Sequence, residues 1–197
     1  SACLVGSEMC IRDRDRIAHP DVHFFYPTNS TSKVKKASSS DFIEEWRVFL
    51  EKGKNLSLSE WYLEIGLGNK QGVINIGEAE KISKLSALKS FQGGPKMFVI
   101  WMAEKINISA SNKLLKLLEE PPENTTFILV SDYKGQLLPT ILSRCQRFDL
   151  RRVNLEQIFQ HLKKISDIEK GKISEGALKL LARASEGSVR DAVSLLD

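Results

Sequence analysis

Lys96-Met-Phe-Val-Ile-Trp-Met102 is a nearly continuous apolar run, and it decides the fold class. Such a run is expected of a strand buried on both faces in a parallel sheet. A second run, Thr126–Val130, predicts a second buried strand. Between them Ser109–Glu120 has helical spacing and stops at Pro121, because proline lacks an amide donor and disfavours helix before it. Its inward residues are Ala110, Leu114, Leu117 and Leu118. Strand, helix and strand at this spacing predict a right-handed parallel α/β unit.

The residues upstream supply further elements. His19–Pro27 has β-branched and aromatic residues between two prolines, which predicts a short strand. Thr28–Ser40 is rich in Ser, Thr and Lys, which indicates a solvated loop. Asp41 is a good N-cap, and apolar residues recur after it at helical spacing until Gly53. A helix is therefore predicted to begin at Asp41.

A glycine-containing stretch separates this helix from the next one. Leu58–Leu67 has apolar residues at mixed spacing, for which a helix is the weaker interpretation. Gly66-Leu-Gly-Asn-Lys-Gln-Gly72 lacks the ending of a phosphate-binding loop and does not join a strand to a helix, so it indicates a mobile loop. Val73–Ile76 then enters a helix over Gly77–Leu88. The apolar face of that helix contains Ile82, Leu85 and Leu88.

Beyond the second apolar run the pattern becomes helical. A short helix is predicted near Gln136–Leu142, followed by an extended piece at Gln146–Leu150. From Asn154 onward the spacing of apolar residues is purely helical. The helices expected there are Leu155–Ile165, Ser174–Ala184 and a third opened by Ser188.

The domain boundaries follow from this change of pattern. We expect an α/β core over 15–152 and a small all-α domain over 153–197, incomplete within its third helix. Residues 1–14 resemble an in-frame translation of a sequencing adapter and are left out of the fold prediction, whereas charged residues argue against a signal-like segment. The native chain is then expected to begin near Asp15, lacking the first strand of the core and any phosphate-binding loop.

Composition narrows the class of protein. The 197 residues carry a net charge of +4, which permits contact with nucleic acid but does not require it. No apolar run is long enough to cross a bilayer. Cys3, Cys10 and Cys145 form no CxxC pair, so neither disulfides nor a zinc site is predicted, and a reducing cytoplasmic compartment is favoured. His19 and His23 lie out of register on a predicted strand, so we interpret them as structural and expect no metal.

Two strings of residues are more specific than composition. Leu114-Leu-Lys-Leu-Leu-Glu-Glu-Pro-Pro122 is followed by Leu138-Pro-Thr-Ile-Leu-Ser-Arg-Cys145. In this order and at this separation they resemble the signature of the bacterial DNA polymerase III clamp-loader AAA+ family, closest to its delta-prime subunits. The resemblance runs from about His19 to the end of the chain. It implies a P-loop NTPase-like AAA+ core with a parallel sheet, truncated at its N-terminus, and a truncated all-α lid domain.

The resemblance implies a catalytic residue that acts on a neighbouring subunit. Arg144 matches the arginine finger that enters the neighbour's ATP site, where a permanently charged, planar guanidinium stabilises charge on γ-phosphate oxygens. The alternative is an ordinary surface salt bridge. ATP-hydrolysing relatives have an Asp-Glu pair where this chain has Trp101 and Met102, a degenerate Walker B motif. Glu104 is expected to lie out of reach past the strand end. Mg-ATP is therefore expected on the neighbouring subunit and no cofactor on this chain.

Weaker site predictions follow from the same resemblance. Arg190 matches a sensor-2 position that contacts nucleotide in active relatives, and equally fits a solvent-facing residue at a capped helix start. Cys145 is interpreted as a packing residue. Four polar residues in and before the helix that follows Trp101 are candidates for DNA contact: Lys105, Asn112, Lys113 and Lys116. A small basic cluster is interpreted as a solvated loop: Lys33, Lys35 and Lys36.

The function implied is that of a subunit that does not hydrolyse ATP. It would supply an arginine finger for ATP-dependent loading of the sliding clamp onto primed DNA. Its expected partners are the gamma/tau and delta subunits in a hetero-oligomer, the sliding clamp and primer-template DNA, with no membrane. One alternative is an active gamma/tau-like ATPase subunit. The other is an interaction module with no part in catalysis.

Overall fold

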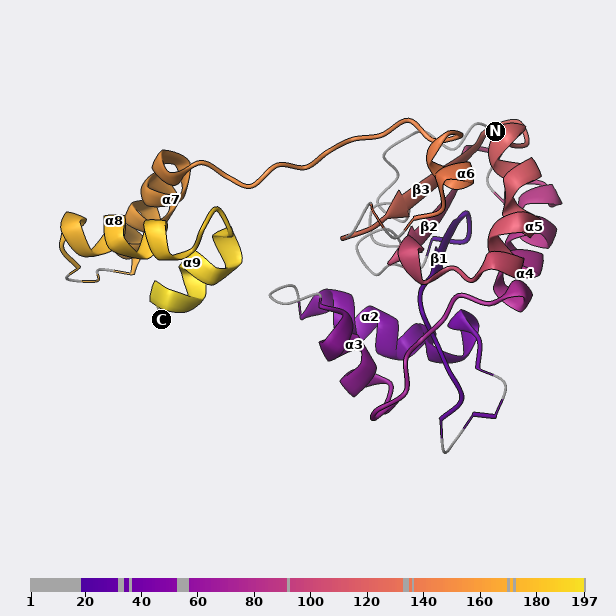
Figure 1. Ribbon diagram of the computed structural model, residues 1–197, viewed down its shortest axis with the longest axis horizontal. Coiled ribbons are helices and arrows are strands. Elements are labelled where there is room, and N and C mark those ends of the chain that lie inside the picture. The colour runs from indigo at the N-terminus through magenta and orange to yellow at the C-terminus, as the bar shows by residue number, and fades with distance from the viewer. Residues whose placement is uncertain are drawn as a thin grey trace. The chain divides into compact units, whose positions relative to one another are not determined.

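The computed structural model describes residues 19–31, 34–35, 37–52, 57–91, 93–132, 135, 137–169, 171 and 173–196 (Figure 1). The adapter-like segment 1–14, Lys33, Lys36, the helix end at Gly53 and the start of the short helix at Gln136 lie outside these residues. The chain divides into two compact units, one ending at Arg147 and one beginning at Phe148. Each unit has its own hydrophobic core.

The sheet of the first unit is parallel, as the two apolar runs predicted. Its described strands have the order β1-β2-β3. The register places Ile100 between Phe25 and Leu129. The expected α/β fold class is therefore confirmed. The strands are β1 (Val22–Phe25), β2 (Lys96–Trp101) and β3 (Thr125–Val130).

Two helices, α4 (Ile76–Ala87) and α5 (Ile108–Glu119), lie side by side against one face of this sheet (Figure 1). An asparagine begins each of them, because its side-chain oxygen satisfies amides that have no partner in the first turn. Asn75 accepts from the amide of Gly77 at 2.8 Å, and Asn107 accepts from the amide of Ala110 at 2.8 Å. The core beneath them contains Phe98, Ile100, Ile82, Ala110, Leu114 and Leu118. Leu88, predicted to face inward, is 61% exposed because α4 ends one residue earlier.

An aromatic cluster lies beneath α2 (Ile43–Glu51) and α3 (Leu58–Glu64) and meets the opposite face of the sheet through Phe24 and Trp101. Tyr26 and Trp46 stack with ring centroids 4.2 Å apart, and Trp61 meets Trp46 edge-on at 5.2 Å. The indole of Trp61 donates to the carbonyl of Pro27 at 2.9 Å, so its polar atom is satisfied inside the cluster. We call these packed rings the aromatic layer, which comprises Phe24, Tyr26, Phe42, Trp46, Phe49, Trp61 and Trp101.

The starts of these helices differ in part from prediction. Asp41 does not cap α2: it lies within a 3-10 turn, η1 (Ser39–Phe42), and its carboxylate accepts from the amide of Ser38 at 2.9 Å. The segment with mixed spacing does form a helix, α3, because Ser57 caps it and accepts from the amide of Glu60 at 3.3 Å.

Burial along β2 is one-sided, which corrects the expectation of a strand buried on both faces. Phe98 and Ile100 are fully buried under α4 and α5, whereas Met97, on the other face, is 38% exposed. β3 alternates in the same way, with Ile128 38% and Val130 40% exposed. The aromatic layer meets this second face where Trp101 packs on Trp46, at the carboxyl end of β2. A continuous run of apolar residues therefore does not mean that both faces of the strand are buried along its whole length.

Two buried charges fix the ends of α4. Lys96, 5% exposed, donates to the carbonyls of Leu85, Ser86 and Leu88, so its ammonium satisfies the carboxyl end of the helix. Glu78, 1% exposed, accepts from the amide of Ser39 at 2.9 Å and from its hydroxyl at 2.5 Å. These contacts attach α4 to β2 at one end and to η1 at the other.

The first unit ends shortly after a short helix, and an exposed segment follows at the start of the second unit. α6 (Pro139–Leu142) places Ile141, 1% exposed, in the core. The extended piece predicted at Gln146–Leu150 belongs to no strand in the described part of the chain. Phe148 and Leu150 are 76% and 98% exposed, because no described strand lies beside them.

The second unit is all-helical, as the sequence predicted. Its core includes Ile158, Leu162, Leu178 and Ala192. The hydroxyl of Ser188 accepts from the amide of Asp191 at 3.2 Å, which confirms the predicted opening of the third helix. No helix within the described ranges is long and apolar enough to span a membrane. The helices are α7 (Leu155–Ile168), α8 (Glu175–Ala184) and α9 (Val189–Leu196).

Candidate functional site

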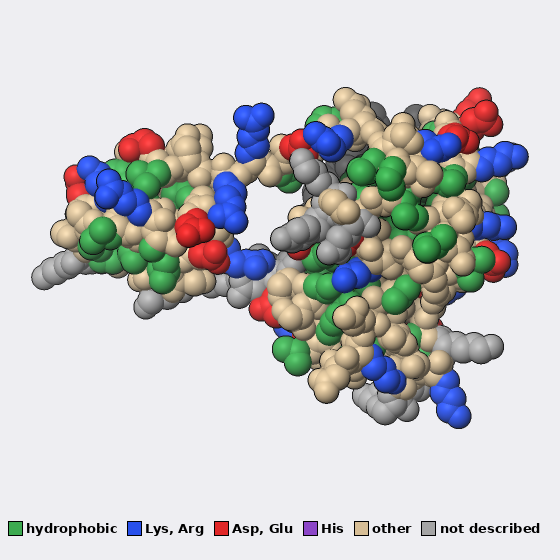
Figure 2. All heavy atoms as spheres, viewed as in Figure 1, with side chains coloured by type: hydrophobic (Ala, Val, Ile, Leu, Met, Phe, Trp, Pro, Cys, Tyr) green, Lys and Arg blue, Asp and Glu red, His purple; other side chains and the backbone are tan. Residues whose placement is uncertain are grey.

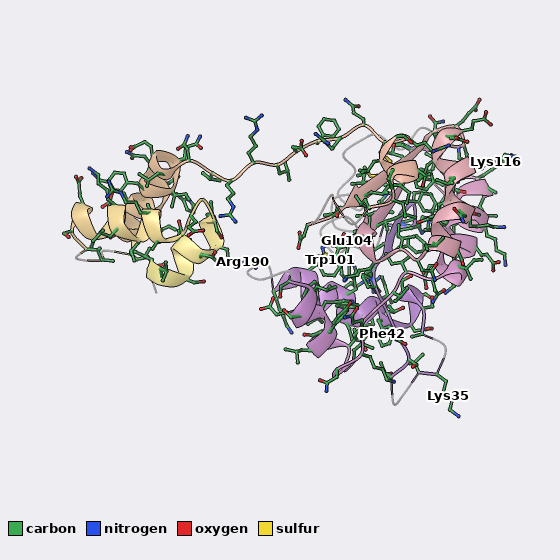
Figure 3. All side chains as sticks on the ribbon, in the orientation of Figure 1. Lys35, Phe42, Trp101, Glu104, Lys116 and Arg190 are labelled. Carbon is green, nitrogen blue, oxygen red and sulfur yellow. The ribbon has the colours of Figure 1, made fainter. Side chains whose placement is uncertain are left out.

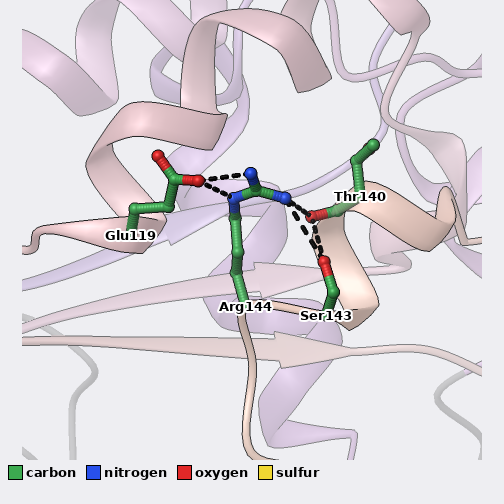
Figure 4. Close-up of polar contacts among 4 residues, drawn as sticks. All are labelled: Glu119, Thr140, Ser143 and Arg144. Atoms are coloured by element: carbon green, nitrogen blue, oxygen red, sulfur yellow. Dashed lines mark hydrogen bonds and ion pairs between the residues drawn. The ribbon is translucent and has the colours of Figure 1, made fainter.

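Arg144 lies in the turn that follows α6, and its side chain is 27% exposed. Its Nε donates to Glu119 Oε1 at 2.6 Å, and Nη2 forms an ion pair with the same oxygen (Figure 4). Nη1 donates to the carbonyl of Thr140 at 2.7 Å and lies 3.3 Å from the hydroxyl of Ser143. All three guanidinium nitrogens therefore have partners within the chain, from α5 on one side and α6 on the other.

Short-range structure explains why Arg144 lies here. Pro139 occupies the first turn of α6, where its fixed φ and missing amide suit a helix start. Buried Ile141 anchors the turn, and the amide of Arg144 donates to the carbonyl of Ile141 at 3.0 Å. Cys145 then packs against the core, and burial raises the pKa of its thiol. A raised pKa disfavours the thiolate, which supports the interpretation of Cys145 as a packing residue.

The ion pair with Glu119 is open to water. The Glu119 side chain is 46% exposed, so the pair contributes about 0–1 kcal/mol. Sequence reasoning did not find Glu119, although it belongs to the Glu-Glu-Pro-Pro string, because only the fold brings it to a residue 25 positions away.

The tip of β2 carries no oxygen ligand. Trp101 turns into the aromatic layer, with its rings 5.3 Å from Trp46 and 5.7 Å from Phe49. Met102 is 3% exposed and has a left-handed backbone, with φ 54° and ψ 55°. An indole and a thioether cannot bind Mg²⁺, which requires oxygen ligands.

Glu104 is the carboxylate next to this tip (Figure 3). It lies in η2 (Ala103–Lys105), directly after the strand, and its Oε2 is buried without a hydrogen-bond partner among the described residues. The charge of Glu104 acts on Tyr62. Burial is the main cause of the raised pKa of Tyr62, and the negative charge of Glu104 raises that pKa further. Glu104 therefore lies past the strand end, where the sequence placed it.

The candidates for DNA contact lie along α5 and just before it. Asn112, Lys113 and Lys116 are exposed on the outer side of the helix, whereas Lys105 in η2 is only partly exposed. In Figure 2 the described Lys and Arg side chains are spread over the visible face of the first unit and do not form a single patch there. Charge alone therefore does not define a nucleic-acid surface on that face.

The other predicted residues are placed as follows. Arg190 is exposed in the first turn of α9, where the positive end of a helix disfavours a cation. His19 Nδ1 accepts from the amide of Asp21 at 3.1 Å, and His23 packs on Phe98 with ring centroids 4.9 Å apart. Both of these histidine side chains therefore make contacts within the fold. Lys35 is exposed. The described residues contain no group of three or more His, Cys, Asp or Glu side chains that could hold a metal.

The glycine stretch after α3 is part of the packing. Gly66 and Gly68 have φ of +66° and +59°, which only glycine adopts without strain. A Cβ on Gly72 would lie 2.8 Å from the ring of Tyr62 and 3.0 Å from the backbone of Pro27. These glycines therefore serve chain reversal and close approach, and no phosphate-binding loop is formed by them.

The architecture is that of an AAA+ α/β core followed by a helical domain. A single-residue mutant of RuvB from Thermotoga maritima superposes with a TM-score of 0.50 and 18% identity, and the match covers 64% of this chain and 42% of that one. This similarity establishes the fold class alone.

The family is set by sequence. Residues 6–154 match the family described as DNA polymerase III, delta subunit, and residues 157–197 match the DNA polymerase III clamp loader subunit, ATPase lid domain. The chain belongs to the DNA polymerase III clamp-loader family, in the group of gamma/tau and delta' subunits.

Individual relatives come from both kinds of subunit. DNA polymerase III subunit tau of Bacillus subtilis is 38% identical over 144 residues, which are 73% of this chain and 25% of that protein. DNA polymerase III subunit delta' of Haemophilus influenzae is 39% identical over 100 residues, which are 51% of this chain and 31% of that protein. The chain thus spans about a quarter to a third of these relatives.

Proposed function

We propose that this chain acts as a delta-prime-like clamp-loader subunit that hydrolyses no ATP and supplies Arg144 to the ATP site of a neighbouring subunit. The neighbour would hold Mg-ATP. The assembly, with gamma/tau and delta subunits, would load a sliding clamp onto primed DNA. Membership of the clamp-loader family and the 39% identity to a delta' subunit support this proposal.

One observation carries the proposal: positions 101 and 102 at the strand tip carry no acid, whereas the Arg144 guanidinium is partly exposed. Trp101 packs in the aromatic layer and Met102 is buried. Neither position provides a carboxylate that could align Mg²⁺ or polarise water. Arg144 keeps 27% of its side chain exposed, on a turn fixed by Ile141. A cation held in that way suits a charge-stabilising role in another subunit's site.

An active gamma/tau-like ATPase is the second candidate. The longer match to the tau subunit favours it, together with Glu104, whose buried Oε2 has no described partner beside the tip. The side chains of Trp101 and Met102 argue against it, because an indole and a thioether provide no oxygen that could bind Mg²⁺. An interaction module without catalytic effect is the third candidate, and substitution of Arg144 separates it from the others.

DNA contact and nucleotide contact are secondary parts of the proposal. Lys113 and Lys116 present cations on the outer side of α5, where phosphate oxygens of a duplex can approach them. Arg190 at the start of α9 would bind a phosphate rather than contribute to stability, since its charge opposes the helix dipole.

The test is Arg144→Ala in the full-length protein, reconstituted with the other subunits of its clamp loader. We expect clamp- and DNA-stimulated ATP turnover at the adjoining site to fall by an order of magnitude or more, while gel filtration still shows the assembled complex. The matched control is Arg151→Ala, which removes an exposed guanidinium outside the site. Unchanged turnover would favour the interaction module, and hydrolysis by the purified protein alone would favour the active ATPase.

A further inference from the structure

Glu119 contacts one particular edge of the Arg144 guanidinium. A single carboxylate oxygen, Oε1, is bound by both Nε and Nη2, which form the side edge of the group (Figure 4). The carbonyl of Thr140 accepts from Nη1 at 2.7 Å, and the hydroxyl of Ser143 lies at 3.3 Å from the same nitrogen. The guanidinium is therefore held from two sides by groups of its own chain.

This arrangement leaves the outer end of the group available. A guanidinium has five N–H donors: one on Nε and two on each terminal nitrogen. Glu119 Oε1 accepts the hydrogen bond from Nε and forms an ion pair with Nη2, and the carbonyl of Thr140 accepts from Nη1. Among the described residues, Nη2 has no partner besides Glu119, and Nη1 also donates to the hydroxyl of Ser143 at 3.3 Å, a long hydrogen bond that a phosphate oxygen can replace. One donor on each terminal nitrogen is the geometry that binds two oxygens of a phosphate.

The strength of the ion pair decides whether Glu119 withholds Arg144 from other ligands or only orients its side chain. Exposed pairs of this kind shift an equilibrium by about fivefold at most. That is too little to withhold Arg144 from a phosphate that it would bind through charge-assisted hydrogen bonds. It is enough to select one arrangement of a long side chain that otherwise samples many. The backbone of Glu119 is fixed, because it lies in the last turn of α5, which ends before Pro121-Pro122.

We propose that Glu119 is a positioning residue for Arg144: its carboxylate holds the side edge of the guanidinium so that the Nη1–Nη2 end faces outward for phosphate oxygens of a neighbouring subunit. This inference rests on the proposed function of Arg144. It assigns a role in trans catalysis to the first acid of the Glu-Glu-Pro-Pro string, which in isolation has the character of an ordinary helix end.

The experiment compares Glu119→Ala and Glu119→Gln with Arg144→Ala in the reconstituted full-length complex. For Glu119→Ala we expect kcat for ATP to fall by about fivefold with KM for ATP unchanged, because an oriented cation matters most for the charge of the transition state. Glu119→Gln keeps an oxygen acceptor at the same place and should restore most of the loss. Glu120→Ala, which removes the adjacent exposed acid, should leave kcat unchanged.

A double-variant cycle separates positioning from other roles. In the Arg144→Ala background, Glu119→Ala should have no further effect, because the group that it positions is gone. An equal loss in both backgrounds, a rise in kcat for Glu119→Ala, or no change at all would each overturn the inference. If Arg144→Ala itself leaves turnover unchanged, the proposed function fails and this role fails with it. A loss for Arg144→Ala without one for Glu119→Ala would overturn only the positioning role.

Discussion

Replacing Trp101 by Asp places at the strand tip the acid that the proposed function says this chain lacks, and we expect it to destabilise the first unit. Trp101 packs against Trp46 and Phe49 in the aromatic layer, at centroid distances of 5.3 and 5.7 Å. Truncating a fully buried Trp costs about 3–5 kcal/mol. Because Trp101 is only partly buried, we take the lower limit, about 3 kcal/mol, for Trp101→Asp. Trp101→Phe keeps a ring in place and should cost about 1 kcal/mol.

Urea unfolding followed by tryptophan emission measures this effect in the first unit, since Trp46, Trp61 and Trp101 all lie there. With an m-value of about 2 kcal/mol/M, the midpoint for Trp101→Asp should fall by roughly 1.5 M. Met97→Asp is the matched control, because Met97 lies on the same strand and face but is 38% exposed. Its midpoint should fall by no more than about 0.5 M, given the usual cost of surface substitutions.

Equal shifts for Trp101→Asp and Met97→Asp would refute the reasoning, because they would mean that Trp101 contributes no more than an exposed residue. A shift below about 0.3 M for Trp101→Asp would have the same meaning. The packing of Trp101 in the aromatic layer would then not be what disfavours an acid at this strand tip.

Three further predictions concern the fold that positions the site. Lys96→Met should cost about 2 kcal/mol, because three carbonyls at the end of α4 lose their donor, whereas Lys84→Met on the exposed side of α4 should change the urea midpoint little. Burial lowers the pKa of His23 from 6.5, so the free energy of unfolding should fall as the pH drops below 6.5. His23→Gln should flatten this pH dependence between pH 7.5 and 5.5. The same slope of unfolding free energy against pH in both proteins would contradict this prediction. Gly187→Ala should lower the melting temperature of the helical unit, because φ is +89° there and a Cβ would lie 2.7 Å from Arg152; equal melting of wild type and variant by circular dichroism would exclude that constraint.

The sequence predicted the strands and helices of the fold better than it predicted which parts of them remain exposed or unpaired. Strand, helix and strand were found because apolar runs and helical spacing both respond to one physical effect, the burial of apolar area. That effect could not reveal that Met97 and Ile128 keep more than a third of their area exposed, since exposure depends on which distant helices cover the sheet. Likewise, the extended segment with Phe148 and Leu150 has strand-like composition, yet no described strand pairs with it.

The candidate site divides in the same way. Trp101, Met102 and Arg144 were located by their place in local strings of residues. Their partners were not: Glu119 reaches Arg144 across 25 positions, and Trp46 reaches Trp101 across 55. A pairing of this kind is a property of the assembled sheet and its helices, so a single sequence contains no short-range signal for it.

The left-handed backbone at Met102 bears on whether a single substitution could place an acid at this strand tip. A non-glycine residue in that conformation costs on the order of 1 kcal/mol, and the buried thioether offsets this cost, because removing such a side chain costs about 2–5 kcal/mol. A glutamate at that position would have the same backbone strain, but its burial would not be favourable, since its charge would lie away from water. A metal-binding strand tip would therefore need the neighbouring rings to be remodelled first, so under the proposed function a single substitution here would not give the chain an ATPase site of its own.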